Sequence, residues 1–167
     1  HAMYRDKIRE FCLYYFFPYY SFDMEQSLFF FLAGRYEFKD KGIDVYIDAL
    51  GRLNKMMKAN KAKKTIIAFI WVPGNIRGIK HKLLENRTYF EDIKEEVDDN
   101  INEIRRDLLY SIMSGRKISE DSIFHKDILY AIKKKIDIFK HEGKPPILTH
   151  DLHDEENDVI VKSIRAA

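Results

Sequence analysis

Two uninterrupted apolar stretches constrain the fold of this chain more than any other feature of its sequence. The first is LFFFLAG at residues 28–34 and the second is TIIAFIWVP at residues 65–73. Because each stretch is continuous rather than alternating, each predicts a strand that is buried on both faces. Between them, apolar residues recur at steps of four, three and three, which predicts a helix that begins near Gly42 and ends near Met57. A strand, a helix and a strand in this order predict a βαβ unit with parallel strands and a right-handed crossover.

Amphipathic helices are predicted on both sides of this unit. The stretch MYRDKIREFCLYYF predicts a short helix that Pro18 ends, with Cys12 as a small core residue rather than a nucleophile. A period of about 3.67 residues predicts one long helix, and its apolar positions are Phe90, Ile93, Val97, Ile101, Ile104, Leu108 and Ile112. A second helix is predicted from about Ser119 to Phe139, so that the two form an αα-hairpin. The stretch ILTH predicts a further short strand, and DEENDVIVKSIR predicts a closing helix with acidic residues at its N-terminal turn.

The composition excludes several classes of protein. The chain has 167 residues, 46% of them hydrophobic and 34% charged, which fits a folded domain and not a disordered one. A net charge of +2 does not indicate a nucleic-acid surface. The single cysteine excludes a disulfide framework and favours a reducing compartment. Neither a membrane span nor a signal peptide is predicted, so we expect a soluble, cytoplasmic protein.

The loop after the first predicted strand carries the most informative candidate site. Gly34 ends the strand, Arg35 offers a planar fork that matches phosphate oxygens, and Lys41 lies at the start of the next helix. Ligands of open α/β sheets bind outside the carboxyl ends of the strands, and a helix N-terminus favours anions. The loop therefore predicts a diphosphate site. The alternative is that the two cations form surface ion pairs, Arg35 with Glu37 and Lys41 with Asp44.

The stretch THDLHDEEND holds a second candidate cluster. His150, His153, Asp151 and Asp154 could bind a metal ion through a His-x-x-His pair with nearby acids. In the alternative interpretation, His150 and Thr149 bond to the backbone at a strand end and the acids cap the last helix.

Several quoted stretches give the chain a resemblance to a known family. It resembles the glycogen synthases of the eukaryotic type, glycosyltransferase family 3, at the strand, loop and helix FFFLAGRYEFKDKGIDVYIDALGRLN. The similarity extends to the strand TIIAFIWVP, to PPILTHDLHDEENDVIVKSIR and to the N-terminal HAMYRDKIREF. The helical region from about residue 78 to residue 140 is similar in placement more than in sequence.

The resemblance implies a retaining glucosyltransferase that uses UDP-glucose as donor and glycogen as acceptor, with no metal or other cofactor. The family's loop arginine and lysine contact the donor diphosphate, and they fall on Arg35 and Lys41, beside Gly34. A histidine and a lysine that help regulated members to bind glucose 6-phosphate fall on His1 and Arg5. No catalytic residue of the family falls within this chain.

The resemblance also predicts how the chain is organised. The fold class is α/β, a partial Rossmann-like sheet unit of the GT-B type with a long helical hairpin insertion. Residues 1–77 are predicted to start a donor-binding domain, residues 78–142 to form the insertion, and residues 143–167 to return to the domain. Because the family's other Rossmann-like domain and its Glu-x7-Glu motif in an EPWG context have no counterpart, we expect an internal fragment that is inactive alone. The rival interpretation is a non-enzymatic helical module that self-associates through Phe90–Ile112.

Overall fold

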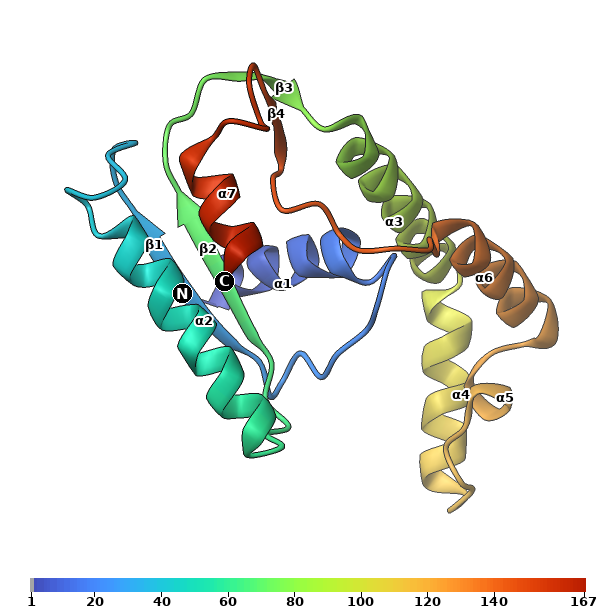
Figure 1. Ribbon diagram of the computed structural model, residues 1–167. Helices are drawn as coiled ribbons and strands as arrows, with labels where there is room; N and C mark the ends of the chain where they lie inside the picture. The colour runs from blue at the N-terminus through green and yellow to red at the C-terminus, as the bar shows by residue number, and fades with distance from the viewer. Residues whose placement is uncertain (1) are drawn as a thin grey trace. The chain divides into compact units, whose positions relative to one another are not determined.

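The computed structural model describes residues 2–167, and the chain divides into two compact units. The α/β unit consists of residues 22–80 and 146–167, and the helical unit consists of residues up to Ser21 and of residues 81–145. We describe each unit by itself (Figure 1).

The predicted βαβ arrangement forms the centre of the α/β unit. Strand β1 (Leu28–Ala33) pairs in parallel with β2 (Ile66–Trp71), and helix α2 (Ile43–Ala59) connects them. The register runs from Leu28 opposite Ile66 to Ala33 opposite Trp71. The strand, helix and strand expected from the periodicity are therefore confirmed.

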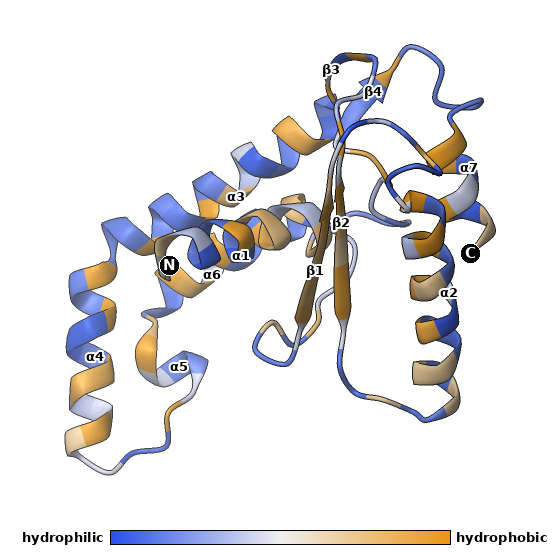
Figure 2. Cartoon of the chain, turned by 90° about the vertical axis from the view of Figure 1, so that its left-hand side faces the viewer, coloured by the Kyte–Doolittle hydropathy of each residue, from blue (hydrophilic) through white to orange (hydrophobic). Residues whose placement is uncertain are grey.

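The core of the α/β unit lies between the parallel strands and two helices. Helices α2 and α7 (Val159–Ala166) lie on the same side of the strands (Figure 2). Their buried residues Ile43, Ile47 and Ile160 form one cluster, and partly buried side chains from the strands pack against it. Because aliphatic side chains alternate along a strand, Leu32 and Ile70 reach this cluster while their neighbours point to the opposite face.

That opposite face corrects one expectation. Continuous apolar runs predicted strands buried on both faces, but Phe31 and Trp71 are exposed. Phe31 stacks on Phe69 with ring centroids 5.1 Å apart, and Trp71 meets Phe31 edge-on at 5.3 Å. The aromatic side chains thus cover one another instead of lying under a second helical layer of the same unit.

The further strand predicted at ILTH is shifted and pairs elsewhere. Strand β4 (His150–Leu152) is antiparallel to β3 (Ile76–Ile79), and neither joins the parallel pair. The prediction failed because the sequence IRGI is short and lacks a clear alternation, so β3 was not recognised as a partner.

The helical unit contains five helices among the described residues. They are α1 (Ala2–Phe16), α3 (His81–Asp99), α4 (Ile101–Met113), α5 (Glu120–Ile123) and α6 (Lys126–Phe139). The single long helix predicted over residues 90–112 is wrong, since the chain breaks at Asn100, whose side-chain Nδ2 donates to the Glu96 backbone oxygen at 2.8 Å. Hydrogen bonds from a side chain to the nearby backbone compete with the backbone hydrogen bonds of a helix. The second predicted helix is also interrupted, because Phe124 and His125 take extended backbone conformations.

The core of the helical unit joins α1, α3 and α6. Its buried apolar residues are Cys12, Tyr15, Leu83, Ile128, Ile132 and Phe139. The prediction that Cys12 is a core residue is confirmed, and its burial raises the pKa of the thiol to about 12. Asn86 is a buried polar residue whose Oδ1 lies 2.9 Å from His141 Nε2. In residues 2–167, no helix is both long and apolar enough to cross a membrane.

Candidate functional site

The strand-end loop, which we define as Gly34–Gly42, connects β1 to α2 and carries the predicted phosphate-binding residues. Gly34 N donates to Trp71 O at 3.1 Å, so the parallel ladder continues one residue past β1. Within the loop, Lys41 N donates to Glu37 O at 3.1 Å. The loop ends at Gly42, whose φ of 66° is a left-handed conformation that glycine adopts most readily.

The loop brings its two cations together. Arg35 Nη1 lies 3.9 Å from one carboxylate oxygen of Glu37, and Lys41 Nζ lies 3.6 Å from the other. The predicted surface pair between Arg35 and Glu37 is therefore present. The predicted pair between Lys41 and Asp44 is wrong, because Lys41 turns to Glu37 and Asp44 Oδ1 accepts a bond from Val45 N at 2.9 Å.

Both cations are accessible to a ligand. The side chains of Arg35 and Lys41 are 81% and 44% exposed, and exposed pairs of this kind contribute little to stability. A methyl group placed on Gly34 would lie 3.7 Å from the stem of Lys41, so the lysine runs close along the backbone where β1 ends. The loop thus presents two exposed donors, and the stem of Lys41 lies beside the backbone of Gly34.

The N-terminus of α2 does not add free backbone donors to this site. Ile43 N and Asp44 N both donate to Phe38 O, at 3.1 and 3.3 Å, and Val45 N is bonded to Asp44 Oδ1. The expectation that open N–H groups at this helix start would hold an anion is therefore wrong for this conformation. The positive charge of the site comes from side chains.

Sequence reasoning missed the residue that fixes the loop, Tyr36. Its hydroxyl donates to Asp158 Oδ2, and Asp158 Oδ1 accepts from Ile160 N and Val161 N at 3.0 Å each, which caps α7. Burial, followed by the hydrogen bond to Asp158, raises the pKa of Tyr36. An aspartate directly before VIVKSI is a recognisable cap signal, but its partner 122 positions earlier is not readable from the sequence.

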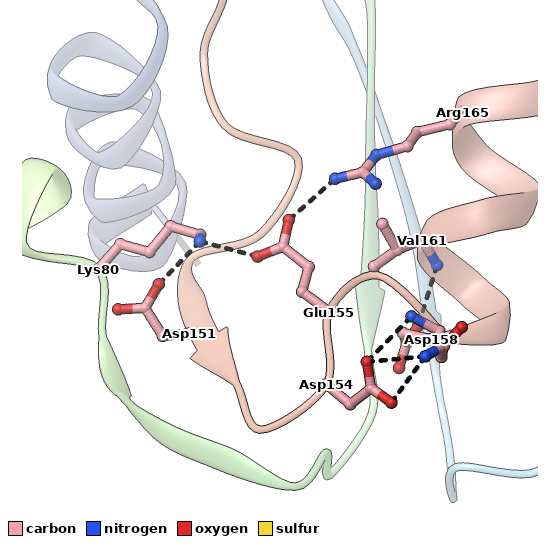
Figure 3. Close-up of polar contacts among 8 residues, drawn as sticks. Lys80, Asp151, Asp154, Glu155, Asp158, Val161 and Arg165 are labelled. Carbon is pink, nitrogen blue, oxygen red and sulfur yellow. Dashed lines mark hydrogen bonds and ion pairs between the residues drawn. The ribbon is translucent and has the colours of Figure 1, made fainter.

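A second polar network joins the β3–β4 pair to α7 (Figure 3). Lys80 Nζ binds Asp151 Oδ1 at 2.8 Å and Glu155 Oε2 at 3.0 Å, and Glu155 Oε1 binds Arg165 at 3.1 Å. Burial works against the charge on Lys80, but the hydrogen bonds from the two carboxylates outweigh it and raise the pKa of this lysine. The network therefore orders the segment that leads to the Asp158 cap.

The predicted cluster at residues 149–154 is divided among structural contacts. His150 Nδ1 lies 2.8 Å from Thr149 Oγ1, His153 Nδ1 accepts a bond from Arg77, and Asp154 bonds to Asn157. Within residues 2–167, no group of three or more histidine, cysteine or acidic side chains is arranged to hold a metal ion.

Of the two predicted glucose 6-phosphate residues, the structure describes only Arg5. Arg5 belongs to α1 in the helical unit, with its Nε 4.0 Å from Asp6 Oδ1. His1 precedes the residues that the structure describes.

Comparison with known proteins shows similarity along the whole chain. The sequence model of a family described as "Glycogen synthase" matches residues 1–167. The chain is 30% identical over 165 residues to the "Glycogen [starch] synthase, liver" of Mus musculus, covering 99% of this chain and 23% of that protein. It is 30% identical over 167 residues to the "Glycogen [starch] synthase" of Dictyostelium discoideum, covering 99% of this chain and 19% of that protein. It is 29% identical over 175 residues to the Saccharomyces cerevisiae "Glycogen [starch] synthase isoform 1", covering 99% and 25% respectively. The chain spans about a quarter or less of the length of these curated relatives.

Proposed function

Because this chain belongs to the glycogen synthase family, we propose that it is part of a glucosyltransferase that moves glucose from UDP-glucose to the non-reducing end of an α-1,4-glucan. In this proposal the α/β unit belongs to a Rossmann-like, GT-B type donor domain, and residues 78–142 form a helical insertion. In this proposal the reaction takes place in the cytoplasm, with UDP-glucose as the donor and glycogen as the acceptor. The single cysteine fits a reducing compartment.

The observation that carries the proposal is the convergence of Arg35 and Lys41 on one carboxylate. Two cations that share both oxygens of Glu37 are close enough together to share the oxygens of a diphosphate. The strand-end loop also lies at the carboxyl end of β1, where ligands of α/β sheets bind. A diphosphate would displace Glu37, which is a partly exposed and therefore weakly held partner.

The chemistry assigned to this loop is electrostatic. When glucose leaves the donor, negative charge grows on the UDP oxygens, and fixed cations lower the energy of that state. Arg35 supplies a planar fork and Lys41 a point charge, and neither needs to transfer a proton. Gly34 leaves the backbone open for close approach of the ligand.

The test is the affinity of the 167-residue chain for UDP. We expect Arg35→Ala and Lys41→Ala each to weaken UDP binding by about 10- to 100-fold, because each loses a charge-assisted hydrogen bond. Glu37→Gln should strengthen binding, since it removes the competing carboxylate. Arg52→Ala is the matched control, because Arg52 is an exposed arginine of the same unit that pairs with Asp48 on α2. Equal affinity in Arg35→Ala, Arg52→Ala and the unchanged chain would contradict the proposal.

A second function is favoured by the apolar surface of α4. Leu109, Ile112 and Met113 follow the spacing that places side chains side by side on a helix, and all are exposed. We propose that this surface, the α4 patch, binds a second copy of the chain, so that the helical unit assembles the enzyme into a homo-oligomer. Two copies of an apolar helix face can cover one another in a symmetric contact.

A further inference from the structure

Tyr36 lies between Arg35 and Glu37 in the strand-end loop, and its side chain packs on the core of the α/β unit. Arg35 on one side of it is exposed, whereas the Tyr36 side chain is partly buried and packs against the cluster of Ile43, Ile47 and Ile160. The loop therefore has an outer surface made of charges and an inner side where the rings of Tyr36 and Phe38 pack on the core, and of these two rings only Tyr36 carries a hydroxyl.

The Tyr36 hydroxyl binds a rigid partner. Asp158 accepts the Tyr36 hydroxyl with one carboxylate oxygen and caps α7 with the other (Figure 3 shows Asp158 and Val161). Both residues whose N–H groups bind Asp158 are buried, since Val161 is fully buried and Ile160 belongs to the core cluster. Because α7 is held by this packing, the carboxylate has little freedom to follow a moving loop.

The positions of Arg35 and Lys41 are linked to Tyr36 by the backbone and by one hydrogen bond. Arg35 and Glu37 are the direct neighbours of Tyr36, and Glu37 O accepts a bond from Lys41 N. We propose that Tyr36 and Asp158 form a positioning pair that holds Arg35 and Lys41 ready for a diphosphate. This inference rests on the proposed function, because a loop that binds no diphosphate needs no such alignment.

The benefit of the pair is pre-organisation. A loop that is already ordered loses less conformational freedom when the ligand binds, and this difference appears directly in affinity. The buried setting and the Asp158 charge also keep the Tyr36 hydroxyl protonated, so it remains a donor throughout the neutral pH range.

The test compares two tyrosines of the same unit. Tyr36→Phe removes the anchoring hydroxyl and keeps the ring, while Tyr46→Phe removes a buried hydroxyl of α2 that has no hydrogen-bond partner within the described residues. At a temperature well below unfolding, we expect Tyr36→Phe to weaken UDP binding about fivefold and to speed amide hydrogen exchange in residues 34–42. Tyr46→Phe should leave both unchanged. Asp158→Ser, which retains a good helix-capping residue but lacks the second oxygen that binds the Tyr36 hydroxyl, should behave like Tyr36→Phe.

The possible results separate this inference from the function on which it rests. If Arg35→Ala weakens UDP binding and Tyr36→Phe does not, the positioning role is wrong and the diphosphate site stands. A Tyr36→Phe variant that only unfolds at a lower temperature, with unchanged UDP affinity, shows a structural role and also overturns the inference. If Arg35→Ala has no effect either, both the site and the positioning pair are wrong.

Discussion

The α/β unit differs from the α4–α5 segment of the helical unit in how far apart in the sequence its polar contacts reach. In the α/β unit, side-chain bonds join residues that are far apart in the sequence, as Tyr36 joins Asp158 and Lys80 joins Glu155. The polar contacts of α4 and α5 are mostly local, for example Arg106 with Glu103 and with Asp107. Long-range polar contacts define one loop conformation, whereas local ones stabilise a helix without deciding what covers its apolar face.

The same contrast appears in what each unit leaves exposed. The α/β unit presents charged side chains on the strand-end loop and the aromatic rings of Phe31 and Trp71 on its strands, and its core is fully buried at Ile43 and Val161. The helical unit leaves the α4 patch exposed, with Met113 reaching 86%. A charged loop on a fixed core suits a small anionic ligand, and an apolar helix face suits another protein surface.

Removing a buried side chain from the core should give the largest loss of stability. That loss should be confined to the α/β unit. Ile43→Ala is expected to lower the free energy of unfolding by about 3 kcal/mol, because it opens a cavity under α2. The fluorescence of Trp71, the single tryptophan, reports this unit during denaturation. Val45→Ala on the exposed face of α2 should cost less than about 0.5 kcal/mol. Similar losses in both variants would mean that the core lies elsewhere.

Substitution in the α4 patch should affect association rather than folding. We expect the double change Leu109→Ser and Ile112→Ser to raise the dissociation constant of self-association at least about tenfold, since apolar contact area is lost. Sedimentation velocity over a range of concentrations measures this. Val45→Ser with Met56→Ser removes two exposed apolar side chains of α2 and should change nothing. A chain that stays monomeric at all concentrations contradicts the proposed oligomer.

Substitutions at two glycines, one in each unit, allow the rigidity of the backbone in the two units to be compared. Gly42 and Gly115 have φ values of 66° and 67°, and an added methyl group would meet nothing within 4 Å in either place. Gly42→Ala should cost about 1 kcal/mol, because its loop is tied to the core and cannot relax. Gly115→Ala should cost less, since the exposed turn after α4 can adjust its backbone. Thermal unfolding of both variants tests the difference, and a larger loss for Gly115→Ala would reverse the comparison.

The smallest expected effect is a pH dependence of the helical unit. Burial, and then the charge of Lys82, lower the pKa of His141 below its ordinary 6.5. The unfolded chain therefore takes up this proton first as the pH falls through 6.5, and stability is lost on the acidic side. Circular dichroism at the helical minimum should show a lower urea midpoint at acidic pH, and His141→Gln should reduce that shift. A shift that His141→Gln leaves intact would assign the effect to another group.

Periodicity predicted the elements that are defined by local sequence. The strands around Phe30 and Phe69 and the helix from Ile43 appear where expected, because short apolar runs bounded by glycine or proline favour strands and a helical repeat favours a helix. Cys12 was likewise placed correctly in a core. The candidate loop was also found in this way, since Arg35 and Lys41 stand where an apolar run ends.

Breaks within helices, and contacts between residues far apart in the sequence, could not be predicted from the local pattern. The break at Asn100 coincides with side-chain bonds from Asn100 to Glu96, and the apolar repeat of the flanking residues gives no sign of it. The pairing of β3 with β4 joins segments that are separated in the sequence by residues 81–145 of the helical unit. Tyr36 looks like any aromatic residue after a strand until Asp158 is brought next to it. Such contacts are decided by tertiary packing rather than by local pattern.

The most direct test of the central claim is a map of where UDP binds on the chain. Backbone amide signals of the 167-residue chain are followed by NMR during titration with UDP. The proposed site predicts that shifts concentrate in residues 34–42 and around Asp158, and that Arg35→Ala removes them while Arg52→Ala does not. Shifts confined to the helical unit, or no shifts at millimolar UDP, would contradict the assignment of the strand-end loop as the diphosphate site.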